Sequence, residues 1–304
     1  MPLRRLVATF VVACLAVLAG CDDGPPPATV GNPDAGAAEP DSRFPTYVAL
    51  GDSYTAAPGV QVTEQESGCL RSNGNYATLV AGLLKAKFVD VSCSGASTLS
   101  LVGSQRTSEH VYPPQFQALS PDTSLVTLGI GGNDLELFNT LISVCAQLGL
   151  SEPDAAPCRD YMKENGEKSD LLLEKIDKIT TRVTSALKGI HDRSPQATVV
   201  LVGYPQPVPA KGQCKILPLA KGDYPYVRKI VAALGAGMEK AARKGDAIYV
   251  DMLGPSKGHD ICAGQDAWVN GIATDVNRAL AFHPFGEEQH AVADLILEQL
   301  EALP

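Results

Sequence analysis

Short apolar runs alternate with longer amphipathic segments along most of the chain. Each apolar run ends at a glycine or a polar residue, as is typical of strands that are buried in a sheet. We expect strands at 47–50, 88–91, 124–128, 197–202 and 247–250. Apolar positions recur at the three- and four-residue spacing of a helix at 76–87, 169–190, 226–244 and 287–300.

The alternation of short strands with longer helices predicts a parallel sheet that has helices on both faces. We find no internal repeat and no sign of a second domain, so we expect one domain over residues 46–304. Ligands of such sheets bind beyond the carboxyl ends of the strands. The loops that follow the strands are therefore where candidate chemistry should lie.

The N-terminus reads as an export signal. Arg4 and Arg5 precede an apolar run over 6–19, which is too short to span a bilayer comfortably. The run ends in Ala19-Gly20-Cys21, which resembles the lipoprotein box of bacteria. We expect a signal peptide over 1–20 and a lipid on Cys21, so that the protein is exported and either anchored to the envelope by that lipid or secreted. An ordinary signal peptide with an incidental cysteine is the alternative.

Residues 21–45 should form a disordered tether, because they are rich in proline and aspartate and contain almost no bulky apolar side chain. The rest of the composition suits a globular domain, with 45% hydrophobic and 19% charged residues. The formal net charge of −9 argues against a nucleic-acid partner. We expect a monomer.

The cysteines indicate an oxidising compartment. Two of the eight, Cys14 and Cys21, precede the domain and leave six, which in an exported protein predicts three disulfides. Six cysteines allow about 15 pairings. Closure of short local loops favours the sequential pairing Cys69–Cys93, Cys145–Cys158 and Cys214–Cys262. No Cys-x-x-Cys pair occurs, so we expect no metal site.

Four loops carry the candidate chemistry, and they follow one another in chain order. Gly51-Asp52-Ser53 follows the first strand, and Gly95 lies in a small-residue turn after the second. Gly131-Gly132-Asn133-Asp134 follows the third strand, and His283 precedes the last helix. Each loop alone is typical of a turn or a helix cap, and neither the dinucleotide-binding nor the phosphate-loop spacing fits. The four together are more specific.

These four blocks resemble those of the SGNH (GDSL) hydrolase family over about residues 46–300, most closely its secreted bacterial esterase/lipase branch. The resemblance implies a flavodoxin-like three-layer α/β/α sandwich around a five-stranded parallel sheet, with three disulfides in sequential arrangement. It implies Ser53 as the nucleophile and His283 as the base, with no cofactor or metal. The oxyanion donors would be the Ser53 and Gly95 N–H groups and the Asn133 side chain.

One position departs from the family pattern. The last block of the family usually reads Asp-x-x-His, but Leu280 stands three residues before His283. Family members with this departure use a Ser–His dyad in which a backbone carbonyl at that position holds the imidazole. The resemblance therefore implies the Leu280 carbonyl as the partner of His283, while Asp275 and Asp251 remain alternatives.

These features predict a carboxylic ester hydrolase, an esterase or lipase, that acts on a small-molecule or lipid ester through an acyl-enzyme. The membrane would be its partner through the N-terminal lipid. A carbohydrate O-deacetylase on the same fold is one alternative, and a non-catalytic surface binding module is another. The four intact blocks argue against the module, because a binder needs neither Ser53 nor His283. The proline-rich segment 204–225 should roof the pocket.

Overall fold

The computed structural model of the protein describes residues 41–163 and 170–304. The predicted signal peptide, Cys21 and residues 21–40 of the predicted tether lie outside the described residues.

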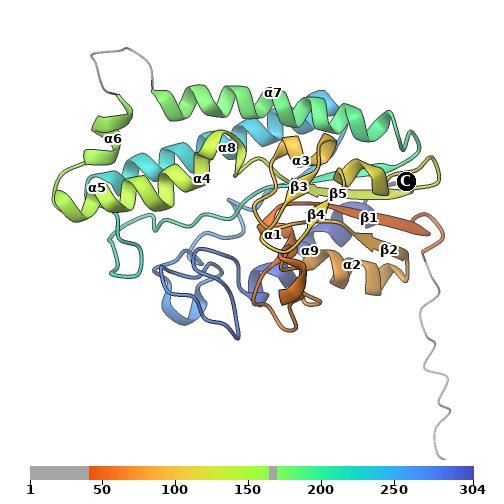
Figure 1. Ribbon diagram of the computed structural model, residues 1–304, viewed down its shortest axis with the longest axis horizontal. Coiled ribbons are helices and arrows are strands. Elements are labelled where there is room, and N and C mark those ends of the chain that lie inside the picture. The colour runs from red at the N-terminus through yellow and green to blue at the C-terminus, as the bar shows by residue number, and fades with distance from the viewer. Residues whose placement is uncertain (1–40, 164–169) are drawn as a thin grey trace, which may run out of the picture. The chain divides into compact units, whose positions relative to one another are not determined.

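A five-stranded parallel sheet forms the centre of the domain (Figure 1). Its strands are β1 (Thr46–Gly51), β2 (Lys87–Asp90), β5 (Leu125–Gly129), β6 (Thr198–Val202) and β7 (Ile248–Val250). They lie side by side in the order β2-β1-β5-β6-β7. Every residue of β5 is buried, which explains why this strand is largely apolar and does not alternate between apolar and polar residues. The sheet confirms the prediction from the sequence.

Helices cover both faces of the sheet (Figure 1). The long helices α7 (Leu171–His191) and α8 (Asp223–Gly245) pack against each other on one face. The other face carries α2 (Tyr76–Leu84) and α9 (Gly286–Glu301), which also pack together. Two clusters of buried apolar side chains fill the space on either side of the sheet. The three-layer α/β/α sandwich is therefore confirmed.

Several short elements occupy the loops between these strands and helices. The helices are α1 (Ser53–Ala56), α3 (Thr98–Val102), α4 (Leu137–Asn139), α5 (Cys145–Ser151) and α6 (Pro157–Met162). A small antiparallel pair joins β3 (Gln105–Arg106) to β4 (Val111–Tyr112). Pieces this short carry no periodicity, so the pattern of apolar residues did not predict them.

The packed domain starts earlier in the chain than residue 46. Phe44 is only 3% exposed and belongs to the core on the α2–α9 side. Arg43 donates to the carbonyls of Leu300 and Leu303, at 3.1 and 3.4 Å, and so holds this segment against the end of α9. Residues 41–45, which the sequence places in the tether, therefore pack against the domain.

The three predicted disulfides are all present: Cys69–Cys93, Cys145–Cys158 and Cys214–Cys262. In the part of the chain that the structure describes, no helix has the length and apolar character needed to cross a membrane.

The order of the strands decides where a ligand can bind. The chain goes from β1 to β2 on one side of β1, whereas β5 is followed by β6 and β7 on the opposite side. The direction of winding changes between β1 and β5, and this switch point leaves a crevice at their carboxyl ends. Ser53 lies two residues after the end of β1, and Asn133 lies just beyond β5.

Candidate active site

The turn that carries Ser53 is held from both sides. The side chain of Asp52 caps α1 by accepting from the Tyr54 N–H at 2.9 Å, and the Asp52 N–H donates to Gly129 O on β5 at 2.9 Å. A Cβ at Gly51 would lie 2.7 Å from Gly129 O, so only glycine allows β1 and β5 to approach this closely. Ser53 is therefore presented from a rigid turn at the switch point.

Asp52 also links this turn to the glycine-rich loop after β5. Its carboxyl is 1% exposed and accepts from the Tyr204 hydroxyl at 2.5 Å. The same hydroxyl accepts from the Gly132 N–H at 2.9 Å. Burial raises the pKa of Asp52 to about 7, against the hydrogen bonds from Tyr204 and the Tyr54 N–H, which lower it. Asp52 therefore caps α1 and also ties the Ser53 turn to the loop after β5.

The loops that carry Asn133 and Gly95 are tied to each other. The Asn133 side-chain amide donates to Ala96 O at 2.9 Å. Next to it, the buried carboxylate of Asp134 accepts from the N–H of Thr98 at 2.8 Å and from its hydroxyl at 2.5 Å. Arg182 of α7 completes this arrangement with an ion pair to Asp134 at 3.0 Å. Buried charge-assisted contacts thus fix the relative position of the two loops.

His283 is held by a carbonyl, but not by the one that the family resemblance implies. Its Nδ1 lies 2.8 Å from Ala281 O. Because a carbonyl can only accept, Nδ1 carries the proton and the lone pair is on Nε2. Burial lowers the pKa of His283 below its usual value, and the hydrogen bond to Ala281 raises it to a lesser extent. The neutral imidazole that a general base requires is therefore favoured.

The assignment of Leu280 as the partner of His283 is wrong by one residue. The Leu280 carbonyl instead accepts from the Asn270 side chain at 3.1 Å and from the backbone N–H of His283 at 3.2 Å. Phe282 has a φ of +62°, and this tight turn brings Ala281 O to the imidazole.

The two alternative partners do not bond to His283 either. Asp251 accepts from the N–H groups of Leu253 and Gly254, and Asp275 accepts from that of Asn277. Both carboxylates therefore serve local turns.

Ser53, Asn133 and His283 line one cavity of about 100 Å³. Gly95 is not among its lining residues. The Tyr54 hydroxyl donates to Phe282 O at 2.9 Å and so connects the Ser53 turn to the His283 loop. Apart from the hydroxyl groups of Tyr54 and Tyr204, the other lining side chains are apolar: Phe138, Leu141, Ile142, Ala146, Pro205, Pro207, Val208, Leu217, Pro218, Leu219, Val227, Val231, Ile261, Val269 and Phe282. Several of them come from 204–219, so this part of the segment that was predicted to roof the pocket lines the cavity.

Comparison with known proteins identifies this arrangement. The model of the GDSL-like Lipase/Acylhydrolase family matches residues 49–287. The chain belongs to this family.

Individual relatives of the chain are also lipases and esterases by name. The chain is 40% identical over 273 residues to Lipase 2 of Streptomyces coelicolor, which covers 86% of this chain and 85% of that protein. It is 32% identical over 310 residues to an esterase of Streptomyces scabiei, and this match covers 90% of this chain and 85% of that esterase. The crystal structure of phospholipase A1 from Streptomyces albidoflavus matches with a TM-score of 0.66 at 25% identity. The match covers 84% of this chain and 99% of the phospholipase. The protein is a carboxylic ester hydrolase.

Sequence reasoning missed three residues that support the GDSL-like site. Tyr204 lies two residues after the end of β6, so its place near a strand end was a signal that could have been used. Gln289 of α9 accepts from the Tyr76 N–H at 2.8 Å and donates to Tyr54 O at 3.1 Å, which fastens α9 behind the Ser53 turn. Glu288 is a buried carboxyl beside it. Nothing in an amphipathic helix pattern distinguishes these two positions from ordinary surface residues.

Glu288 should make the stability of the protein depend on pH. It is 2% exposed, and burial raises the pKa of its carboxyl from 4.5 to about 8, while the Gln289 amide lowers it. Between these two pH values the folded protein binds more protons than the unfolded chain, so stability falls as the pH rises through that window. We compare the free energy of unfolding of Glu288→Gln with that of the wild type. Between pH 5 and pH 9 we expect the difference to shift in favour of the variant by up to about 4 kcal/mol.

Thermal and denaturant unfolding at pH 5, 7 and 9 measures this effect. Asp52 titrates in both proteins and cancels in the comparison. Glu298→Gln, an exposed position on the same helix, is the matched control and should follow the wild type at every pH. Equal pH slopes for Glu288→Gln and the wild type would show that Glu288 is ionised in the folded protein.

Proposed function

We propose that the protein hydrolyses esters through an acyl-enzyme on Ser53, with His283 as the base, and that its substrates carry medium or long acyl chains. The observation that carries this proposal is the cavity: Ser53, Asn133 and His283 lie along its wall, and the rest of the lining is mostly apolar. A polar reacting end and an apolar wall suit an ester whose acyl chain is extended.

The chemistry follows from these groups. Ser53 Oγ attacks the ester carbonyl carbon while His283 Nε2 takes the hydroxyl proton. The negative charge on the carbonyl oxygen is received by the Ser53 and Gly95 N–H groups and the Asn133 amide. When the tetrahedral intermediate collapses, the C–O bond to the alcohol breaks and His283 gives its proton to the leaving oxygen. Water then repeats the sequence on the acyl-enzyme, which releases the acid and restores Ser53.

The Ala281 carbonyl takes the role that the aspartate carboxylate has in a Ser-His-Asp triad. It accepts the Nδ1–H, so it fixes both the tautomer and the orientation of the His283 ring. A neutral carbonyl stabilises the imidazolium less than a carboxylate does. The lowered pKa of His283 and the uncharged carbonyl of its partner Ala281 both favour a base that is neutral at physiological pH.

A panel of esters tests the acyl preference. We expect kcat/KM to rise at least about tenfold from p-nitrophenyl acetate to the octanoate, because each buried methylene contributes about 0.8 kcal/mol. Val231→Phe, which narrows the cavity from α8, should lower kcat/KM for the octanoate and leave that for the acetate nearly unchanged. Val62→Phe at an exposed position is the control. Preference for acetate and for acetylated xylan would favour the O-deacetylase instead.

The three disulfides are typical of an exported protein. We further propose that residues 1–20 are removed, that Cys21 is lipidated and that the monomeric domain is held at the membrane in this way. The support is the Arg4-Arg5 pair, the apolar run and the Ala19-Gly20-Cys21 sequence. In a bacterial host the protein should incorporate labelled palmitate and stay with the membrane fraction. Cys21→Ser should abolish the labelling, and an unlabelled wild type would contradict the anchor.

A further inference from the structure

The segment from Cys93 to Ala96 carries one N–H group that is left free for a ligand. Cys93 N–H donates to Gly51 O at 3.0 Å, Ser94 N–H to Cys69 O at 2.9 Å, and Ala96 N–H to Cys93 O at 3.0 Å. Within the described residues the Gly95 N–H has no such acceptor. It is the group to which the proposed mechanism assigns part of the oxyanion charge.

The direction of this N–H depends on the peptide bond between Ser94 and Gly95. In a trans peptide the N–H and the preceding C=O point in opposite directions. Gly95 has a φ of +78°, and glycine has no Cβ to oppose a rotation of the adjoining peptide. An oxyanion donor must be preorganised to be effective, so something other than Gly95 itself has to hold this peptide.

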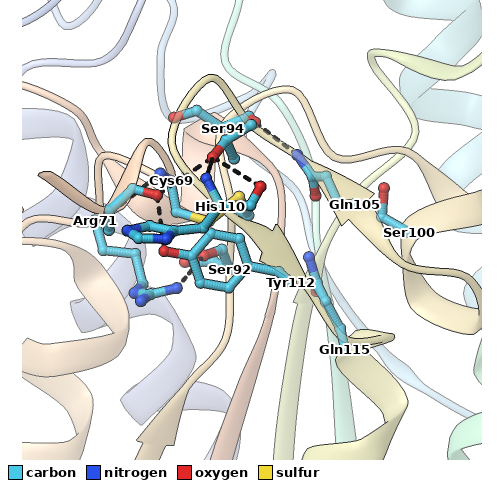
Figure 2. Close-up of a disulfide and its surroundings, with 12 residues drawn as sticks. Cys69, Arg71, Ser92, Ser94, Ser100, Gln105, His110, Tyr112 and Gln115 are labelled. Atoms are coloured by element: carbon cyan, nitrogen blue, oxygen red, sulfur yellow. Dashed lines mark hydrogen bonds between the residues drawn. A yellow bond between two sulfur atoms is a disulfide. The ribbon is translucent and has the colours of Figure 1, made fainter. Parts of the chain in front are cut away.

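Gln105 makes the contact that can hold it. The Nε2 of Gln105 donates to Ser94 O at 2.8 Å (Figure 2). This is the oxygen of the same peptide whose N–H belongs to Gly95. Gln105 comes from β3, which pairs with β4 in the small antiparallel ribbon, so the donor is attached to a separate and ordered piece of backbone.

The orientation of the Gln105 amide is also determined. Its Oε1 is buried and has no hydrogen-bond partner among the described residues. If the amide were turned over, Oε1 would face Ser94 O and two acceptors would meet. Only the orientation with Nε2 toward Ser94 forms a hydrogen bond. The bond to Ser94 O is thus formed even though it leaves Oε1 buried without a hydrogen-bond partner among the described residues.

We propose that Gln105 is a positioning residue for the oxyanion hole: its amide holds the Ser94–Gly95 peptide so that the Gly95 N–H faces the carbonyl oxygen of the ester. This inference rests on the proposed function of Ser53 and Gly95. Gln105 does not touch the substrate and acts through Ser94 O. It stabilises the transition state rather than the bound ester, because the charge on the carbonyl oxygen develops only during the reaction.

Two variants test the inference. Gln105→Glu keeps the shape but replaces the donor with a carboxylate that repels Ser94 O, and Gln105→Met keeps the length without any donor. Gln299→Glu, an exposed position on α9, is the control for the added charge. Loss of a whole oxyanion donor typically lowers kcat by about 10²–10³-fold. Misdirection of one donor should therefore lower kcat by about 10- to 100-fold, with KM within about twofold of the wild type.

An inhibitor separates positioning from a merely structural role. An alkyl boronic acid forms a tetrahedral adduct with a catalytic serine and places an oxygen where the oxyanion develops. Its affinity should fall in both Gln105 variants by about the same factor as kcat. An unchanged kcat, a change confined to KM, or a lower kcat with unchanged boronate affinity would each overturn the inference. If both variants fail to fold, as judged by thermal unfolding, Gln105 is structural and the inference is also overturned.

The same assays include Ser53→Ala, so that the two proposals can fail separately. If Ser53→Ala is inactive and both Gln105 variants match the wild type, only the inference about Gln105 is wrong. If Ser53→Ala retains the wild-type activity, the proposed mechanism fails, and the inference fails with it.

Discussion

Replacing Ser53 with alanine is expected to lower kcat for p-nitrophenyl octanoate by about 10⁵–10⁶-fold, as removal of the nucleophile does in other serine hydrolases. In the proposed mechanism, the variant keeps the cavity and the oxyanion donors but has no atom that can form the acyl-enzyme. Since binding of the ester is largely through the apolar wall, affinity for a non-hydrolysable ester analogue should change by less than about threefold.

The structure suggests that this variant will fold. Ser53 is the first residue of α1, and the cap of that helix is provided by Asp52 rather than by Ser53. Alanine therefore keeps the hydrogen bonds of the turn, and the melting temperature should stay within a few degrees. Ser151→Ala at an exposed position of α5 is the matched control and should retain full activity. Octanoate turnover above about a hundredth of the wild-type rate in Ser53→Ala would mean that another residue is the nucleophile.

The sheet and the long helices could be predicted because their signals are local. A buried strand such as 198–202 consists mostly of β-branched residues, and α7 repeats its apolar residues at helical spacing. The ends of elements were less accurate. The helix expected at 76–87 ends at Leu84, because Lys85 turns into the left-handed region with a φ of +53°. The helix expected from 226 begins at Asp223, since Pro225 falls in its first turn, where proline costs no hydrogen bond.

The candidate site residues could be predicted from the sequence, but the contacts that hold them in place could not. Ser53, Asn133 and His283 stand in recognisable blocks, and the order of the strands brings them to one cavity. The partner of His283 was misplaced by one residue, because the turn at Phe282 depends on a positive φ that its residue type does not announce. Gln105 acts on a backbone carbonyl, and a contact between a side chain and distant backbone leaves no spacing to recognise.

Replacing Asn133 with alanine is expected to lower kcat by about 10²–10³-fold with little change in KM, which is the effect of losing one oxyanion donor. One hydrogen of its amide is engaged by Ala96 O at 2.9 Å, which orients the group, and in the proposed mechanism the other hydrogen is donated to the substrate oxygen. Asn133→Asp has the same shape but brings an acceptor and a charge, so it should be at least as impaired.

Loss of the bond to Ala96 O in Asn133→Ala could also loosen the loop, and a control separates the two effects. Asn73→Ala removes a comparable loop hydrogen bond, from the Val62 N–H at 3.1 Å, away from the cavity lining. Its kcat should stay within about twofold of the wild type. If Asn133→Ala keeps kcat within about threefold, or if its defect lies in KM alone, the amide does not stabilise the transition state. The oxyanion charge would then rest on the backbone N–H groups of Ser53 and Gly95, and the effect of Gln105 on kcat should be correspondingly larger.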